Sequence, residues 1–493
     1  MSAHGPPEVT PAGRPPTPAP TQIPQYAYGW LVYVVGALAA ILLAFAIYKL
    51  NYSFGQAPHR IVKILLGVGI VLLVILRPRI AIFAWFLSLP ISGWMPSTGI
   101  TGLNGANVLF LALVISWAVP ALMRKERLFG RTPLRWPIAA HIGVLGMTGL
   151  VTVMFLPGGS SQSAYGVFFY LWQRIPAVAV YFVVANMGLD EKQIKNLLAT
   201  LAVGAGALGL IALQQFSGVG EAGRVRGGMN SNELGAYFSI CGTMLLAQIV
   251  SSRVFGFFRT VVIWIGAALA SMGVLLSKSR GAYVSFAASL GTMTYLTSKK
   301  AFIVFLIVLA TSPVWAPGFV KDRVAETRSD SVEAVLVGDP TDRLDPAAGV
   351  RLEIWKIVIK EFVRSPIFGH GHASVPTMTA GKLSRPFSAH SLYMETLSDS
   401  GLIGLGVLLW LLAACVRRGR ELLRLADDAF FRGLAIGFLS VTVAVIVANI
   451  FGQRFASRAI TGTFFVLAGL VDRGIGLKRE AAAVRSIKEV PAS

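Results

Sequence analysis

Long apolar runs separated by short polar links recur along most of the chain. The runs lie at 30–48, 61–76, 80–95, 106–123, 136–156, 166–186, 194–216, 233–250, 257–277, 281–297, 300–317, 401–416, 433–451 and 457–472. Most of them have roughly the length that an α-helix needs to cross the hydrocarbon core of a membrane, which is about 17–25 residues. The pattern therefore predicts an all-α bundle of about 12–14 transmembrane helices.

Composition supports a membrane protein. Apolar residues make up 55% of the chain and charged residues only 14%, whereas a soluble domain carries about 25% charged residues. The formal net charge is +21, but the basic residues gather in short links, as expected for cytoplasmic loops, so we expect no nucleic-acid partner. Cys241 and Cys415 lie inside apolar runs and indicate neither a disulfide framework nor a metal site.

The runs divide the chain into five parts. We expect a disordered cytoplasmic tail at 1–29, about eleven spans in 30–317, one large external loop at 318–400, further spans in 401–473, and a basic cytoplasmic tail at 474–493. The tail at 1–29 is rich in Pro, Ala and Thr and lacks the pattern of a signal peptide. The run at 80–95 is short and contains Pro90, so a re-entrant segment is an alternative there.

Basic links set the predicted orientation. With the basic links at 77–79, 124–135, 299–300 and 417–424 in the cytoplasm, the spans alternate consistently and both termini lie inside. The external loops would then be 49–60, 92–105, 157–165, 217–232, 278–280, 318–400 and 452–456.

Several arginines run against this orientation rule. Arg224 and Arg226 lie in the external loop 217–232, Arg280 in the turn 278–280, and Arg351 in the long loop. An anionic ligand would explain them. The alternatives are snorkelling of Arg280 to the lipid–water boundary and an ordinary surface charge for Arg351. Asn230 or a nearby serine could cap the following helix, whose N-terminus would favour an anion.

Arg174 lies inside the apolar run 166–186. A charge within a span is costly and usually faces a cavity or a partner. We therefore expect Arg174 either to line the path of a charged ligand or to belong to a buried pair.

The long external loop has structure of its own. Helical spacing relates its apolar positions Leu352, Trp355, Val358, Ile359 and Phe362. This predicts an amphipathic helix over Val350–Val363, lying against the membrane surface or against the bundle. Pro366 would stop the helix, Gly369 and Gly371 would allow a tight turn, and 321–347 is expected to be irregular.

The same loop ends in candidate chemistry. His390 has a side chain whose ordinary pKa of about 6.5 suits proton transfer, although it could instead be a polar cap for the next span. Glu395 could orient His390 or cap the helix. His370 and His372 flank Gly371, but no nearby cysteine or clear third ligand completes a metal site, so we predict no metal and no cofactor.

Four stretches together resemble a known superfamily. They are Arg224–Asn232, Ser279–Ala282, Arg351–Trp355 with Ser365–Gly371, and His390–Glu395 with Gly401–Leu405. In order and spacing they are similar to the motifs of the bacterial O-antigen ligase and O-antigen or exopolysaccharide polymerase superfamily. Ser391 stands where the family usually has Asn, and Met394 where Leu is common.

The resemblance implies a GT-C-like glycosyltransferase of the inner membrane. Its donor would be a glycan on polyprenyl (undecaprenyl) pyrophosphate, and its acceptor a sugar hydroxyl of a glycan or lipid-linked glycan at the periplasmic face. The reaction would invert the anomeric centre without a metal. Membrane lipids and export-complex proteins are further expected partners.

We also expect roles for individual residues. His390, with Glu395, would serve the acceptor as base or orienting group. Arg280, Arg226, Arg224, Arg351 and Arg174 are the candidates for binding pyrophosphate, since a guanidinium matches phosphate oxygens.

Three further functions remain open from the sequence. The motifs are shared by polymerases, which extend repeat units, and ligases, which attach glycan to lipid A–core. We favour a polymerase because no feature is specific for a lipid A–core acceptor.

A secondary transporter of small anions would show inverted repeats, and no convincing repeat is present. A non-catalytic partner in an export complex is the third possibility.

Overall fold

The computed structural model describes residues 77–95, 105–123, 128, 132–155, 163–220, 223–251, 256–329, 348–380, 382–383 and 386–488. All of them lie within the unit Ala46–Ser493. The predicted tail 1–29 and the predicted spans 30–48 and 61–76 fall outside the described residues. Across the described part of the chain, the one β pairing is an isolated bridge between Ala380 and Leu383.

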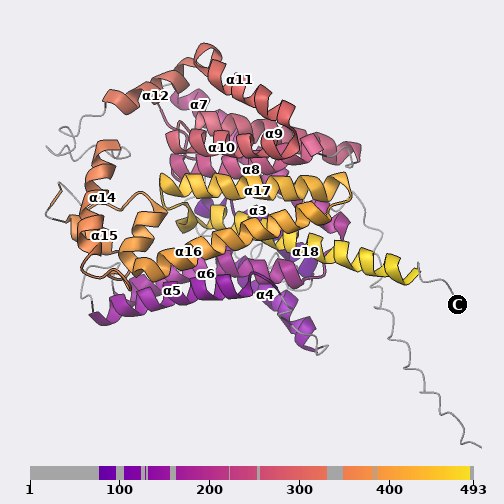
Figure 1. Ribbon diagram of the computed structural model, residues 1–493, viewed down its shortest axis with the longest axis horizontal. Helices are drawn as coiled ribbons and strands as arrows, with labels where there is room; N and C mark the ends of the chain where they lie inside the picture. Colours follow the sequence, from indigo (N-terminus) through magenta and orange to yellow (C-terminus); the bar gives the residue numbers. More distant parts are fainter. Residues whose placement is uncertain are drawn as a thin grey trace, which may run out of the picture. The chain divides into compact units, whose positions relative to one another are not determined.

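Nine helices of the described residues are long and apolar enough to cross a membrane. They are α4 (Gly105–Met123), α5 (Arg135–Phe155), α6 (Ala164–Asn186), α7 (Glu191–Val219), α8 (Ser231–Ser251), α9 (Phe257–Leu276), α16 (Leu392–Leu425), α17 (Ala429–Ile450) and α18 (Arg458–Lys488) (Figure 1). Each corresponds to a predicted run. The prediction of an all-α polytopic membrane protein is therefore confirmed.

Three predicted runs form helices of another kind. The run 80–95 forms α3 (Pro78–Ser88) and η1 (Ser92–Trp94), and α3 is too short to span. The run 281–297 forms α10 (Arg280–Thr297), and 300–317 forms α11 (Lys299–Trp315). After a bend of 97°, α11 leads into α12 (Gly318–Ser329). The expectation of irregular chain from residue 321 was thus wrong as far as residue 329.

Buried hydroxyl pairs explain why α10 is less apolar than the spans. Ser239 of α8 lies 2.9 Å from Ser285 of α10, and Thr243 lies 2.6 Å from Ser289, oxygen to oxygen. Side-chain hydrogen bonds of this kind join helices within membranes, where apolar burial alone gives little preference for one partner. α10 also packs on α17 and α11.

A buried ionic contact joins three spans near the far end of α16. The Tyr181 hydroxyl of α6 donates to Asp472 of α18, and the Arg418 guanidinium of α16 donates to the same carboxylate. Arg418 also pairs with Glu421. Because Tyr181 and Asp472 are buried, this carboxylate depends on its two donors.

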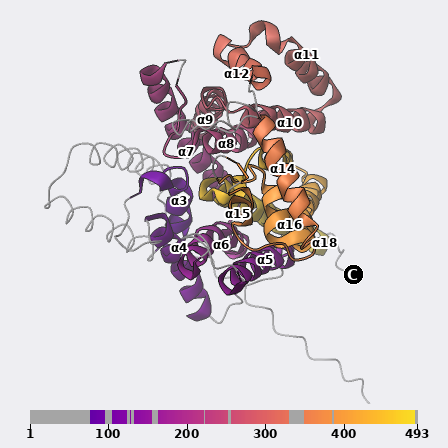
Figure 2. The ribbon, with the colours of Figure 1, turned by 90° about the vertical axis from the view of Figure 1, so that its left-hand side faces the viewer.

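The long loop folds into a small module beside the N-terminal end of α16 (Figure 2). It contains α14 (Ala348–Phe362) and α15 (Ser374–Thr379). Its core consists of Val350, Ile354, Val358, Val375, Phe387 and Ala389. The predicted helix is confirmed; Val358 lies in this core, whereas Leu352 and Ile359 are 55% and 54% exposed.

Glu361 ties the end of α14 to the segment after α15. Its carboxylate accepts from Lys382 at 2.9 Å and from Arg364 at 2.7 Å. The hydrogen bond from Lys382 lowers the pKa of Glu361 below its ordinary value of 4.5. A carboxylate with a lowered pKa stabilises the fold above that ordinary value and loses its contribution as the pH falls through the lowered pKa. The contact therefore persists at neutral pH.

Removal of the Arg418 guanidinium should destabilise the protein. Arg418→Ala leaves the buried Asp472 carboxylate without one of its donors, and breaking a buried ion pair in this way costs about 3–5 kcal/mol. Thermal unfolding of the purified protein in detergent measures the loss. Arg420→Ala, an exposed change two residues along the same helix, is the matched control, and an equal shift for both variants would contradict the assigned role.

Candidate functional site

The span α16 is broken at Gly401, where φ is 63° and ψ is −155°. The break leaves backbone groups of α16 available to the loop segment Pro366–Gly371. Four hydrogen bonds join the two segments: His370 N–H to Ser398 O at 2.8 Å, Gly371 N–H to Asp399 O at 2.9 Å, Leu402 N–H to Pro366 O at 2.8 Å, and Ile403 N–H to Ile367 O at 3.3 Å. We call this pairing the glycine clasp.

Two glycines make the clasp possible. Gly369 has a φ of 72° and Gly401 a φ of 63°, a region that side chains disfavour. A Cβ on Gly369 would lie 2.5 Å from the nitrogen of Ser400, and one on Gly401 would lie 2.4 Å from the carbonyl oxygen of Ile367. The motif around Gly369 and the motif around Gly401 are therefore two halves of one structural unit.

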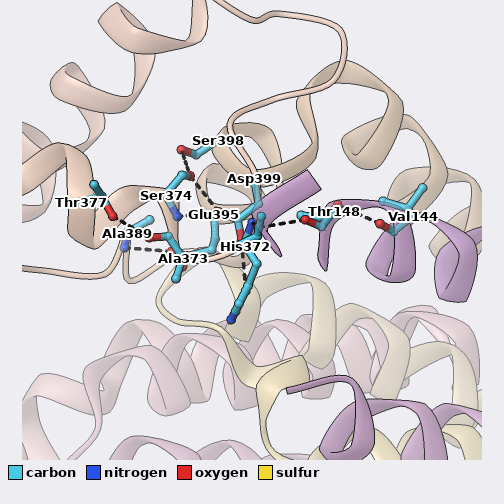
Figure 3. A network of polar contacts seen from close by, with 11 residues as sticks. Val144, Thr148, His372, Ala373, Ser374, Thr377, Ala389, Glu395, Ser398 and Asp399 are labelled. Atoms are coloured by element: carbon cyan, nitrogen blue, oxygen red, sulfur yellow. Dashed lines mark hydrogen bonds and ion pairs between the residues drawn. The ribbon is translucent and has the colours of Figure 1, made fainter. Parts of the chain in front are cut away.

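Asp399 sits at the centre of a polar network beside the clasp (Figure 3). Its carboxylate accepts from the Ser374 hydroxyl at 2.8 Å and the Ser374 N–H at 3.3 Å. The Ser374 hydroxyl also lies 2.7 Å from that of Ser398. His372 Nδ1 is 3.8 Å from Asp399. These contacts fix a buried carboxylate at the break of the span.

His372 connects the network to α5 and α6. Its imidazole lies tilted against the Tyr170 ring with the centroids 3.7 Å apart. The backbone N–H of His372 donates to the Thr152 hydroxyl. The Arg174 guanidinium lies 4.2 Å from the centroid of the same Tyr170 ring. Within the described ranges, no group of three or more His, Cys, Asp or Glu side chains is placed to hold a metal ion.

The turn at His390 is held from two sides. The N–H of Ala389 donates to Glu395 at 3.0 Å, and its carbonyl accepts from the Trp355 indole at 2.9 Å. His390 itself has a φ of 48°, which is uncommon for a residue other than glycine and costs free energy that the surrounding contacts must offset. Glu395 therefore fixes the backbone that presents His390.

Glu395 also meets groups from other elements. The charge of Arg174 acts on its carboxylate, which accepts a hydrogen bond from Gln453 in the loop between α17 and α18. The structure thus brings Arg174 to the acidic residues of α16. This placement favours the buried pair that the sequence left as an alternative for Arg174.

The candidate Arg280 opens α10. Ser279 caps the helix by accepting from the N–H of Ala282 at 3.4 Å. The preceding residue, Lys278, is buried, has a φ of 49°, and places its ammonium 5.6 Å from the ring centroids of Phe216 and Phe319. Arg323 of α12 donates from Nε to the Lys278 carbonyl at 3.1 Å. The beginning of the long loop therefore rests on the turn that carries Arg280.

Arg224 belongs to the same neighbourhood. It donates to Asn232 of α8 at 2.8 Å, and its charge acts, together with that of Arg323, on Tyr283 in the first turn of α10. Asn230 caps α8 by accepting from the N–H of Glu233 at 2.9 Å, as expected for that position.

The remaining candidate ligands, Arg226 and Arg351, lie in other surroundings than Arg280 and Arg224. Arg226 is exposed, and its N–H donates to Gln215 of α7 at 3.1 Å. Arg351 is half-buried on α14. We retain both as proposed ligands beside Arg280, which begins α10, and Arg224, which bonds the first turn of α8 from the preceding loop.

The loop 451–457 was not singled out from the sequence. Phe451 packs against Gly281, where an added Cβ would lie 2.7 Å from that of Phe451. Gln453 bonds Glu395, and the charge of Arg454 acts on Glu233 at the start of α8. This loop contains η2 (Arg454–Ala456). It contacts both the start of α10, where Arg280 lies, and the acidic residue Glu395. Arg454 offered a signal, because it is a basic residue in a predicted external link.

The long apolar helices of the described residues define a multi-pass membrane protein. Residues 265–409 match the family model described as O-antigen ligase. This match confirms the resemblance inferred from the motifs. The match indicates a ligase- or polymerase-type activity on lipid-linked glycans in a membrane. No curated protein matches the chain.

The glycine clasp should not tolerate a side chain. Gly401→Ala would place a Cβ against the backbone of Ile367 at a positive φ, and we expect a loss of at least about 2 kcal/mol in stability. Gly406→Ala, on the same helix, meets open space and is the control. Thermal unfolding and the yield of monodisperse protein compare the two, and wild-type behaviour of Gly401→Ala would show that the clasp is dispensable.

Proposed function

We propose that the protein transfers an oligosaccharide from polyprenyl (undecaprenyl) pyrophosphate to a sugar hydroxyl at the periplasmic face of the bacterial inner membrane. We favour polymerisation of O-antigen or exopolysaccharide repeat units. The observation that carries the proposal is the loop 451–457, which joins the start of α10, where Arg280 lies, to Glu395 and the His390 turn.

The donor side of the reaction needs positive charge. As the anomeric C–O bond breaks, negative charge grows on the departing pyrophosphate, and fixed cations stabilise it. Arg280 begins α10, and Arg224, in the loop before α8, bonds Asn232 in the first turn of α8. The N-termini of these helices add a field of the same sign. Lys278 and Arg323 supply further positive charge on the same turn.

The acceptor side needs a base. In our proposal the hydroxyl oxygen attacks the anomeric carbon from the face opposite the leaving group, so the configuration inverts. The hydroxyl proton passes to the His390 imidazole as the new C–O bond forms and is later lost to water. Glu395 supports this step by holding the Ala389 backbone. Neither step calls for a metal ion.

A ligase that attaches glycan to lipid A–core is the second candidate, because O-antigen ligase is the description of the matching family. The two reactions share donor and chemistry and differ in acceptor. Glycan profiles of a deletion strain separate them: loss of a polymerase leaves single repeats, whereas loss of a ligase leaves intact polymer on the lipid carrier.

Loss of Arg280 should slow the chemical step. Removing one group that stabilises developing charge typically lowers kcat by about 10²–10³-fold, and we expect this for Arg280→Ala. Release of polyprenyl pyrophosphate from a lipid-linked glycan by the purified protein measures it. Lys300→Ala, a loss of charge near the opposite end of α10, should leave the rate unchanged. Uptake of a small anion without release would instead support a transporter.

Loss of His390 should abolish glycan assembly in cells. A deletion strain complemented with His390→Ala should show the profile of the empty vector, because the acceptor would lack its base, while the variant remains in the membrane at wild-type level. Normal glycan with this variant and with Arg280→Ala would favour a non-catalytic role.

Chelation should have no effect on the proposed reaction. We expect the rate of polyprenyl pyrophosphate release to be the same with and without EDTA, since arginines take the part that a metal would play. A rate that falls with EDTA and returns on addition of Mg²⁺ would contradict this part of the proposal.

A further inference from the structure

The loop helix α14 carries a second apolar face in addition to the one in the core of the module. Leu352, Ile359 and Val363 are 55%, 54% and 73% exposed. Residues spaced by seven and by four positions lie on one side of a helix, so these three side chains form a single stripe. The buried residues Ile354 and Val358 lie on another side of the helix.

Basic side chains border this exposed stripe. Lys356, Lys360 and Arg364 follow it on one edge and are exposed. Lys356 pairs with Glu353 at 2.7 Å and Arg364 with Glu361 at 2.7 Å. An apolar stripe flanked by lysine and arginine is typical of helices that lie in a membrane interface, because their long side chains reach headgroup phosphates.

The stripe continues toward the surface of a span. Ile367 and Phe368, just beyond α14, are 53% and 57% exposed. The glycine clasp bonds Ile367 to Ile403 and places this segment beside Leu402 and Ile403 of α16. Leu402 and Ile403 are themselves 54% and 37% exposed on a helix that is apolar enough to cross the membrane. The exposed residues of the loop therefore adjoin a surface that lipid covers.

We infer that α14 and the segment Pro366–Phe368 lie in the headgroup region of the bilayer and that the occupant of the exposed stripe is lipid. Burial of this apolar surface in the bilayer stabilises the module at a fixed depth. Because the same module bonds the backbone of α16 on both sides of Gly401 and also bonds Ala389, the His390 turn is held at the level of the lipid headgroups. This inference does not depend on the proposed glycan transfer.

Spin labels on the full-length protein in vesicles test the inference. Single cysteines at Leu352, Ile359 and Val363 can carry a nitroxide, because the native Cys241 and Cys415 are both 0% exposed. The probe membrane is phosphatidylethanolamine with phosphatidylglycerol. We expect the ratio of oxygen to nickel-chelate accessibility to be several-fold higher at these labels than at Glu353→Cys and Lys360→Cys. Leu402→Cys gives the reference for lipid contact.

Other occupants give distinct results. Stripe labels with the low ratio of Glu353→Cys would show that the stripe faces water and would overturn the inference. Dipolar broadening between labels on different molecules would identify a second copy as the partner, and a ratio that rises only on addition of lipid-linked glycan would identify the donor. Each of these outcomes also excludes lipid as the occupant. Thermal unfolding of each labelled variant, matched to wild type, ensures that the folded protein is compared.

Discussion

The site depends on how the backbone of α16 is satisfied where the helix is broken. A helix that breaks leaves N–H and C=O groups without intrahelical partners, and such groups are costly to bury where water is scarce. Here the loop segment Pro366–Gly371 supplies both kinds of partner through the glycine clasp. This loop segment, which is distant in sequence, is thereby held against the first turns of α16. Its hydrogen bonds fix the position of the loop relative to the bundle.

The glycine clasp positions the polar groups of the site. His370 and Gly371 bond the carbonyls of Ser398 and Asp399, which brings His372 to Asp399 and onto Tyr170. The remainder of the module places Trp355 against Ala389 and so sets the His390 turn. The turn conformation that His390 adopts would be costly in a free loop. It persists because Glu395 and Trp355 hold its neighbour on both sides.

Sequence reasoning succeeded where the governing interactions are local. Apolar run length predicted the nine described spans because the membrane imposes length directly, and the helical spacing around Val358 predicted α14. It did not show which apolar positions of α14 meet the core of the loop module, because that depends on Val375 and Phe387, whose positions are not encoded nearby. The contacts of Tyr170, Asp399 and Gln453 were missed for the same reason. The pairing of Gly369 with Gly401 explains why two motifs occur together, yet spacing alone could not show that they touch.

Charge is distributed unequally between the two parts of the site. Around the start of α10, Lys278, Arg323 and Arg224 surround a turn with positive groups. Beside the break of α16, Glu395 and Asp399 face one arginine, Arg174. An anionic group such as a diphosphate is attracted to the first part, because clustered cations favour negative charge. The proposal that the leaving group binds beside the start of α10 is in accord with this unequal distribution of charge. The loop 451–457 contacts both parts, through Phe451 at Gly281 and Gln453 at Glu395.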